Sequence, residues 1–219
     1  MAEPDPKRRK TAATSTQTNR TTRPFDKADC VTLVIGPERN EMLVHVHYLV
    51  QESEAFRNAF TEDCIARTMI IPHVDYDTMT NYIAFAYIKE LPTAHLVGPR
   101  CDAVSGEEYA TSARLYVLGD QFQNQSLKRA TLGEIKRIST LLDIDTNATF
   151  PSPEAIDIIY KGTSKGDPAR RLMVDMLAEN ADGSWLRPEC NQTFILDLAR
   201  ELLNKSRGTA PSSAPAHLV

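Results

Sequence analysis

The sequence has few cysteines and no long hydrophobic run, and each absence narrows the class of protein. Four cysteines occur among 219 residues, and none belongs to a Cys-x-x-Cys pair. The first 24 residues also lack an apolar core, so we expect no signal peptide and an intracellular, reducing environment with free thiols. No run of about 18 apolar residues is present, so we expect no membrane-spanning helix.

Motifs of catalysis and phosphate binding are absent as well. No Gly-x-Ser-x-Gly motif occurs. Residues 162–166 (Gly-Thr-Ser-Lys-Gly) are not preceded by a predicted strand and do not end in the Lys-Ser/Thr pair of a phosphate-binding loop. His45 and His47 lie two residues apart, which on a strand directs both to one face. No cysteine or carboxylate cluster completes a zinc site around them. We expect His45 to be a structural residue under the first helix, and we expect no enzyme activity, metal, cofactor or small-molecule substrate.

The charge of the chain is unevenly distributed. The net charge is −4, yet residues 1–24 hold a surplus of basic side chains. An acidic remainder gives no reason to expect direct nucleic-acid binding. Lys7, Arg8, Arg9 and Lys10 form a basic run of the kind that nuclear import receptors bind, so we predict a nuclear or nucleocytoplasmic location.

Composition divides the chain into four parts. Residues 1–24 contain no Ile, Leu, Val or aromatic residue, and residues 207–219 are rich in Pro, Ser and Ala. Such segments bury too little apolar surface to offset the entropy lost on ordering, so we predict disordered tails. Between them we predict a domain over residues 25–142 and a helical extension over residues 143–206.

Hydrophobic patterning predicts strands first and helices afterwards. Residues 30–35 and 41–46 are β-branched, apolar runs separated by Gly-Pro-Glu-Arg-Asn, which predicts a hairpin. Apolar residues occur on both faces, so we expect a sheet that is covered on both sides. A third strand is predicted at residues 69–71. Helices are predicted from Ser53, over 75–90, 107–122, 124–142, 153–160, 168–179 and 191–206.

Several residues lie at offsets typical of one family. His45 ends the hairpin, Ser53 follows eight residues later, and Phe56 lies three residues beyond Ser53. Residues 116–120 read Tyr-Val-Leu-Gly-Asp, similar to a Tyr-x-Leu-Ala-Asp pattern on the fourth helix of that family. With the order of elements, these residues resemble the BTB/POZ domain of the type common in fungal proteins. Residues 171–175 and 194–198 resemble a helical extension found after the domain in fungal members.

The resemblance implies an α+β fold with a small three-stranded sheet capped by about five helices, followed by extra C-terminal helices. It implies a non-enzymatic protein-protein interaction module that forms a homodimer or acts as an adaptor for a cullin-type ubiquitin ligase. A nuclear regulator that recruits transcription or chromatin partners is the alternative. We expect Tyr82, Phe85 and Tyr87 to line a partner groove. The residues expected to serve the fold or the dimer are Val31, Leu33, His45, Leu49 and Phe56.

Two positions depart from the family pattern. Cys30 stands where many members have an aspartate that contributes to a charged pocket at the dimer interface. Val46 stands where a basic residue usually follows the family histidine. Both departures argue against the standard dimer of the family.

Overall fold

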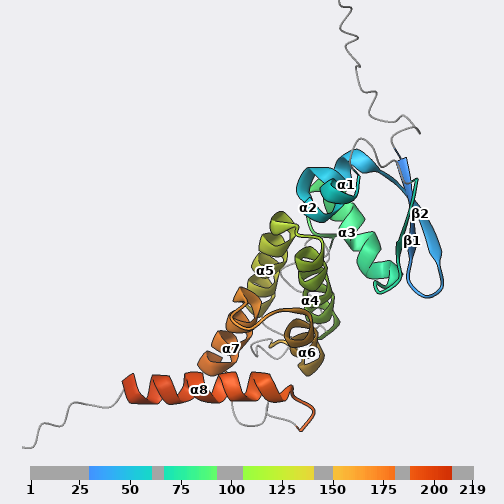
Figure 1. The fold of residues 1–219 in the computed structure, drawn as a ribbon. Coiled ribbons are helices and arrows are strands. Elements are labelled where there is room, and N and C mark those ends of the chain that lie inside the picture. Colours follow the sequence, from blue (N-terminus) through green and yellow to red (C-terminus); the bar gives the residue numbers. More distant parts are fainter. Residues whose placement is uncertain (1–29, 61–66, 93–105, 141–149, 181–187, 209–219) are drawn as a thin grey trace, which may run out of the picture.

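The computed structural model describes residues 30–60, 67–92, 106–140, 150–180 and 188–208 (Figure 1). These residues form a three-stranded mixed sheet and eight helices, so the predicted α+β class is confirmed. The basic run at residues 7–10 and the predicted tail over 1–24 lie outside the described residues. Of the second predicted tail, residues 209–219 also lie outside them.

The sheet has the strand order β2-β1-β3. Strand β1 (Cys30–Ile35) pairs antiparallel with β2 (Asn40–His45) and parallel with β3 (Thr68–Ile71). Gly36 begins the β1–β2 turn at φ 69°, where a side chain would be strained. The hairpin predicted from the Gly-Pro turn signal therefore forms, with β2 one residue earlier than expected.

Three helices pack on one side of the sheet, two of them between β2 and β3 in the chain and one after β3. They are α1 (Val46–Glu52), α2 (Glu54–Ala59) and α3 (Tyr76–Ile88). The sequence did not predict α1, because no side chain caps its first turn and no acidic residue lies there. Burial of Leu49, which is 0% exposed, stabilises α1 instead.

The two faces of the sheet differ in exposure. The inner face carries Val31, Leu33 and Ile35, which pack with residues of α1 to α3 in one core. On the outer face Leu43 is 62% exposed and Ile70 is 58% exposed. Val34, on the same face of the central strand, is only 5% exposed, so the expectation of a sheet covered on both sides is wrong for these two edge-strand positions and not for the centre of the sheet.

Five further helices complete the described structure. They are α4 (Gly106–Gln121), α5 (Gln125–Ser139), α6 (Pro153–Gly162), α7 (Pro168–Asn180) and α8 (Gln192–Gly208). Helices α4 and α5 lie between the sheet region and α6 to α8 (Figure 1). They contribute Leu115, Leu118 and Leu127 to the sheet-side core. Their opposite sides enter a second core with α6, α7 and α8, through Tyr109, Ala113, Tyr116, Ile135 and Ile138.

Candidate interaction surfaces

The segment from His45 to Phe56 joins the sheet to the helices. Ser53 is fully buried, donates a hydrogen bond from Oγ to the carbonyl oxygen of Phe122 (2.6 Å), and accepts one from the Phe56 amide (3.1 Å). The Phe56 ring lies 4.6 Å from that of Phe122 and 6.0 Å from that of Tyr82, measured between centroids. One short segment thus caps α2 and fixes it to the end of α4.

The residues predicted to serve the fold or a dimer are mostly core residues. Val31, Leu33, Leu49 and Phe56 are each at most 2% exposed and belong to the sheet-side core. They are therefore available to stabilise the fold and not to touch another chain in this conformation. Only His45 of that set is half-exposed.

Two of the three residues predicted to line a partner groove are also core residues, which corrects the prediction. Tyr82 is 0% exposed and Phe85 is 2% exposed, and both pack beneath the sheet with Met79. Helix α3 buries so wide an arc because the sheet, α1 and α4 all lie against it. Tyr87, the third residue, is half-exposed at the end of α3.

Tyr87 meets His45 in a cluster of four rings that we call the aromatic surface: His45, His47, Tyr48 and Tyr87. The Tyr87 hydroxyl lies 2.8 Å from His45 Nδ1 and accepts a hydrogen bond from the His45 amide at 3.0 Å. Tyr48 and Tyr87 stack with centroids 4.2 Å apart, and His47 lies edge-on to Tyr48 at 5.4 Å. His45 therefore binds a side chain of α3, in addition to its position at the start of α1.

An ion pair at the last turns of α1 and α3 holds the two helices together. Lys89 Nζ lies 3.5 Å from Glu52 Oε1, and Ser126 of α5 donates a hydrogen bond to Glu52 Oε2 at 2.6 Å. The Ser126 hydrogen bond, together with the Lys89 charge, lowers the pKa of Glu52 despite its partial burial. The aromatic surface thus rests on helices that are fixed to each other.

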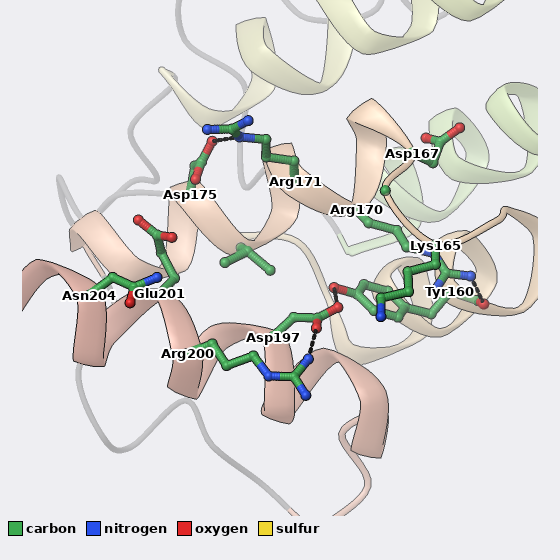
Figure 2. A pocket seen from close by; sticks show the side chains of 12 residues that line it. Tyr160, Lys165, Asp167, Arg170, Arg171, Asp175, Asp197, Arg200, Glu201 and Asn204 are labelled. Atoms are coloured by element: carbon green, nitrogen blue, oxygen red, sulfur yellow. Dashed lines mark hydrogen bonds and ion pairs between the residues drawn. The ribbon is translucent and has the colours of Figure 1, made fainter.

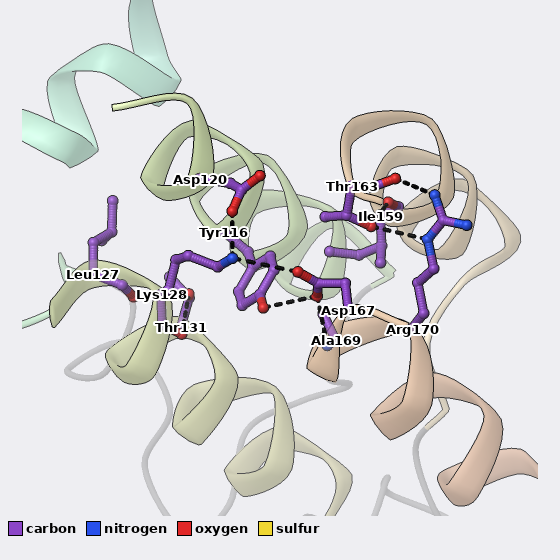
Figure 3. A network of polar contacts seen from close by, with 10 residues as sticks. All are labelled: Tyr116, Asp120, Leu127, Lys128, Thr131, Ile159, Thr163, Asp167, Ala169 and Arg170. Atoms are coloured by element: carbon purple, nitrogen blue, oxygen red, sulfur yellow. Dashed lines mark hydrogen bonds and ion pairs between the residues drawn. The ribbon is translucent and has the colours of Figure 1, made fainter. Parts of the chain in front are cut away.

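A buried polar network connects α4, α5 and the start of α7 (Figure 3). Asp167 Oδ1 accepts hydrogen bonds from the Tyr116 hydroxyl (2.8 Å) and from the Ala169 amide (2.8 Å). Lys128 Nζ lies 3.3 Å from Asp167 Oδ2, forms an ion pair with Asp120, and lies 4.8 Å from the Tyr116 ring centroid. Asp167 therefore caps α7 and, with the same carboxylate, fixes it to the two central helices.

The charge states in this network are set by the burial of its members. Burial, followed by the hydrogen bond to Asp167, raises the pKa of Tyr116 to about 12. Burial opposes the charge of Lys128, but Asp120, Tyr116 and Asp167 together outweigh it and raise the Lys128 pKa. At neutral pH the tyrosine is neutral and the lysine is charged, so neither is suited to proton transfer, and the network is structural.

A cleft of about 370 Å³ lies between the α6–α7 turn, α7 and α8 (Figure 2). Its walls carry basic and acidic side chains in equal number. Arg171 lies 3.9 Å from Asp175 on α7, and Arg200 lies 3.2 Å from Asp197 on α8. The remaining lining residues are Tyr160, Lys165, Gly166, Asp167, Arg170, Val174, Glu201 and Asn204.

Arg170 in this cleft forms its hydrogen bonds with residues at the end of α6. Its guanidinium donates to the carbonyl oxygens of Tyr160 and Thr163 and to Thr163 Oγ1, and it lies 4.6 Å from the Tyr160 ring centroid. These bonds satisfy carbonyl groups that a helix end leaves unpaired. Burial and the nearby Asp197 raise the pKa of Tyr160. The cleft thus combines a neutral phenol with basic and acidic side chains in equal number and is suited to polar contacts.

Sequence patterns do not predict the buried network or the cleft. Lys128 and Asp167 are 39 residues apart, and no spacing rule connects them. The one usable signal is Asp167 followed by Pro168, which is typical of a helix start. Residues 116–120 also carry part of the resemblance to the BTB/POZ family, and Tyr116 and Asp120 both belong to the network.

No group of three or more His, Cys, Asp or Glu residues in the described ranges is arranged to hold a metal ion. Among the described helices, none is long and apolar enough to cross a membrane. Neither a scan against protein-family models nor a search of curated proteins finds a match for this sequence.

Proposed function

We propose that this chain is a non-enzymatic protein-protein interaction module of the BTB/POZ type. The support is twofold: the residues that carry the resemblance, and the way these residues are used in the fold. His45 ends the hairpin, Leu49 enters the core, and Ser53 caps the helix that carries Phe56. These residues have distinct structural roles at the expected offsets, and this supports the proposal more strongly than their identity and spacing in the sequence alone.

The aromatic surface carries the proposal of partner binding. Four rings gather there on the exposed or half-exposed side of α1 and the end of α3, and the next residue, Ile88, is 58% exposed. Aromatic side chains are enriched at protein interfaces because they bury a large area at low entropic cost. We propose that this surface contacts a cullin-type scaffold or a second copy of the chain.

Retention of a cullin from cell extract tests the adaptor form of the proposal. The immobilised full chain should retain a cullin, and His47→Glu with Ile88→Glu should abolish retention because each places a charge on the aromatic surface. Both side chains are exposed, so the double variant should keep its melting temperature.

Tyr76→Glu provides the matched control, since Tyr76 is 42% exposed at the opposite end of α3. The control should retain the cullin as the parent does. If the parent retains no more cullin than an unrelated bait, the adaptor form is rejected. Self-association would then be the remaining form, and it is measured as the loss, in the double variant, of an association that the parent shows and that Tyr76→Glu keeps.

The basic run at residues 7–10 favours the alternative function, a nuclear regulator that recruits transcription or chromatin partners. Four consecutive basic residues follow Pro4 and Pro6 and are suited to binding in an acidic groove. Deleting residues 7–10 from a fluorescent fusion should abolish nuclear accumulation. An unchanged distribution would reject a nuclear import role for this run.

A further inference from the structure

Helix α8 carries two apolar stripes, and it is mainly one of them that packs against the molecule. Phe194 and Leu198 are buried in the second core, and Glu201 and Lys205 continue that side half-buried. Lys205 reaches Glu179 at the end of α7 at 3.6 Å. The sequence predicts that Leu202 shares one face with Phe194 and Leu198, but Leu202 is 45% exposed.

The second stripe of α8 is largely exposed, although Ile195 at its edge is half-buried and packs against the second core. Leu196 is 58% exposed, Leu203 is 60% exposed, and both lie beside Leu202 on the helix surface. We call it the outer stripe, and it repeats with the heptad spacing of helix-helix seams. Its members are Gln192, Ile195, Leu196, Ala199, Leu202, Leu203 and Ser206.

The outer stripe contains no charged residue and runs the length of the helix. Three leucines that are about half exposed leave apolar area in contact with water, and burial of this area would favour association. Arg200 and Asn204 lie on one flank, and Lys205 lies on the other. A stripe bordered by polar residues in this way is typical of a helix that packs against another helix.

We propose that the outer stripe binds the same stripe of a second copy, with the two α8 helices antiparallel. With a two-fold axis between Arg200 and Glu201, Ala199 lies opposite Leu202 of the second copy. Ile195 lies opposite Ser206 of the second copy in the same register. Small residues thus face large ones in successive layers, as a well-packed seam requires. A symmetric dimer needs a patch that is complementary to itself, and this stripe meets that condition.

The area of the stripe sets the strength of the contact. From Gln192 to Ser206 the stripe is roughly 20 Å long at 1.5 Å per residue. A helix pair of this length buries roughly 1,000 Å² in total, at the lower limit for a specific interface. The dimer should therefore be weak and reversible, with a Kd on the order of 10 μM.

Sedimentation velocity of the full chain from about 1 to 200 μM tests the proposal in a range that brackets this Kd. The parent should change from monomer to dimer as its concentration rises. The double variant Leu196→Glu with Leu203→Glu should raise the Kd of dimerisation at least about tenfold. Asn204→Glu is the control, because its side chain is exposed on the same helix but outside the stripe. It should behave as the parent does, and circular dichroism should show the same helix content in all three proteins.

Cysteine cross-linking tests the antiparallel register. A mixture of Ala199→Cys and Leu202→Cys chains should oxidise to the mixed dimer faster than either chain does alone, with the parent as the baseline for its native cysteines. A parent with a single concentration-independent mass would overturn the proposal, as would a stripe variant with an unchanged Kd. This contact does not depend on the aromatic surface. The His47 and Ile88 variants should leave it intact, so either proposal can fail alone.

Discussion

At the scale of single residues, the buried polar side chains explain how short elements are held. Ser53 is the clearest case, because one hydroxyl donates to Phe122 and accepts from Phe56 while it is fully buried. Helix α2 spans only Glu54–Ala59, too short to be stable from its own hydrogen bonds. Its cap and its aromatic contacts supply that stability.

Ser53→Ala should therefore lower the free energy of unfolding by about 2 kcal/mol, since it removes the cap and the shorter of two hydrogen bonds to the Phe122 carbonyl, which keeps only the Ala55 amide at 3.4 Å. Urea unfolding followed by circular dichroism measures the loss. Ser139→Ala is the control, because Ser139 bonds only the Lys136 carbonyl at an exposed helix end. The cap interpretation is wrong if the two variants lose equal stability.

Glu108 gives a prediction about pH. Its Oε2 is buried without a hydrogen-bond partner, and burial raises its pKa above the ordinary 4.5, with Arg137 opposing and Glu134 adding to the shift. A carboxyl with a raised folded-state pKa stabilises the fold below pH 4.5, and this contribution is lost as the pH rises through the raised value. The charged form present at neutral pH is thus the unfavourable one.

Glu108→Gln should raise the melting temperature at pH 7.5, and the gain should shrink as the pH is lowered to 4. Differential scanning calorimetry at both pH values measures the difference. Glu41→Gln, at an exposed position on β2, should change the melting temperature little at either pH. A gain that is equal at both pH values would contradict the role of charge burial.

At the scale of elements, the network around Asp167 decides how α7 joins the central helices. The Asp167 side chain is 7% exposed and that of Lys128 is 13% exposed, so neither charge is well solvated. Removing one partner from such a pair leaves the other buried without its counter-charge. Surface pairs in this chain, such as Lys161 with Asp157, carry no such penalty because the lysine is 74% exposed.

Lys128→Met should cost roughly 3 kcal/mol of unfolding free energy, whereas Lys161→Met should cost at most about 0.5 kcal/mol. Adding Asp167→Asn to Lys128→Met should cost less than the sum of the single losses, because the partners are coupled. Chemical unfolding of the four proteins measures the coupling. Strict additivity would show that the Lys128–Asp167 contact contributes nothing.

At the scale of the whole molecule, the predicted boundary at residue 142 cuts through a shared core. Helices α4 and α5 bury one side against the sheet region and the other against α6 to α8. Arg114 of α4 also pairs with Glu154 of α6 at 2.7 Å. Gly162 permits the close approach, because a Cβ there would collide with Val117. The extension is thus packed as part of one body.

A chain of residues 25–142 should expose Tyr109, Tyr116, Ile135 and Ile138, which are buried in the complete chain. It should bind a hydrophobic dye and unfold without a sharp transition, because these side chains have lost their partners. A sharp transition at the melting temperature of the complete chain would support a separate domain over residues 25–142.

Local sequence patterns are enough to predict most of the helices and strands and their order. Turn residues between β-branched apolar runs predicted the hairpin, and helical periodicity predicted α3 to α8, because both depend on neighbours within a few residues. Helix α1 was not predicted, because its stability comes from burying Leu49 and not from a cap or a charge pattern that the sequence would reveal. The resemblance marked Ser53 and Phe56, which proved to be central to the core.

Which apolar face of a helix meets which neighbour depends on how the helices pack, and local patterns do not reveal it. Periodicity identifies an apolar side of a helix but not what covers it, so Tyr82 and Phe85 were assigned to a groove although they lie in the core. For the same reason Leu202 was assigned to the packed face of α8. The Lys128–Asp167 pair and the cleft between α7 and α8 are contacts between distant segments, and such contacts exist only once the helices are packed.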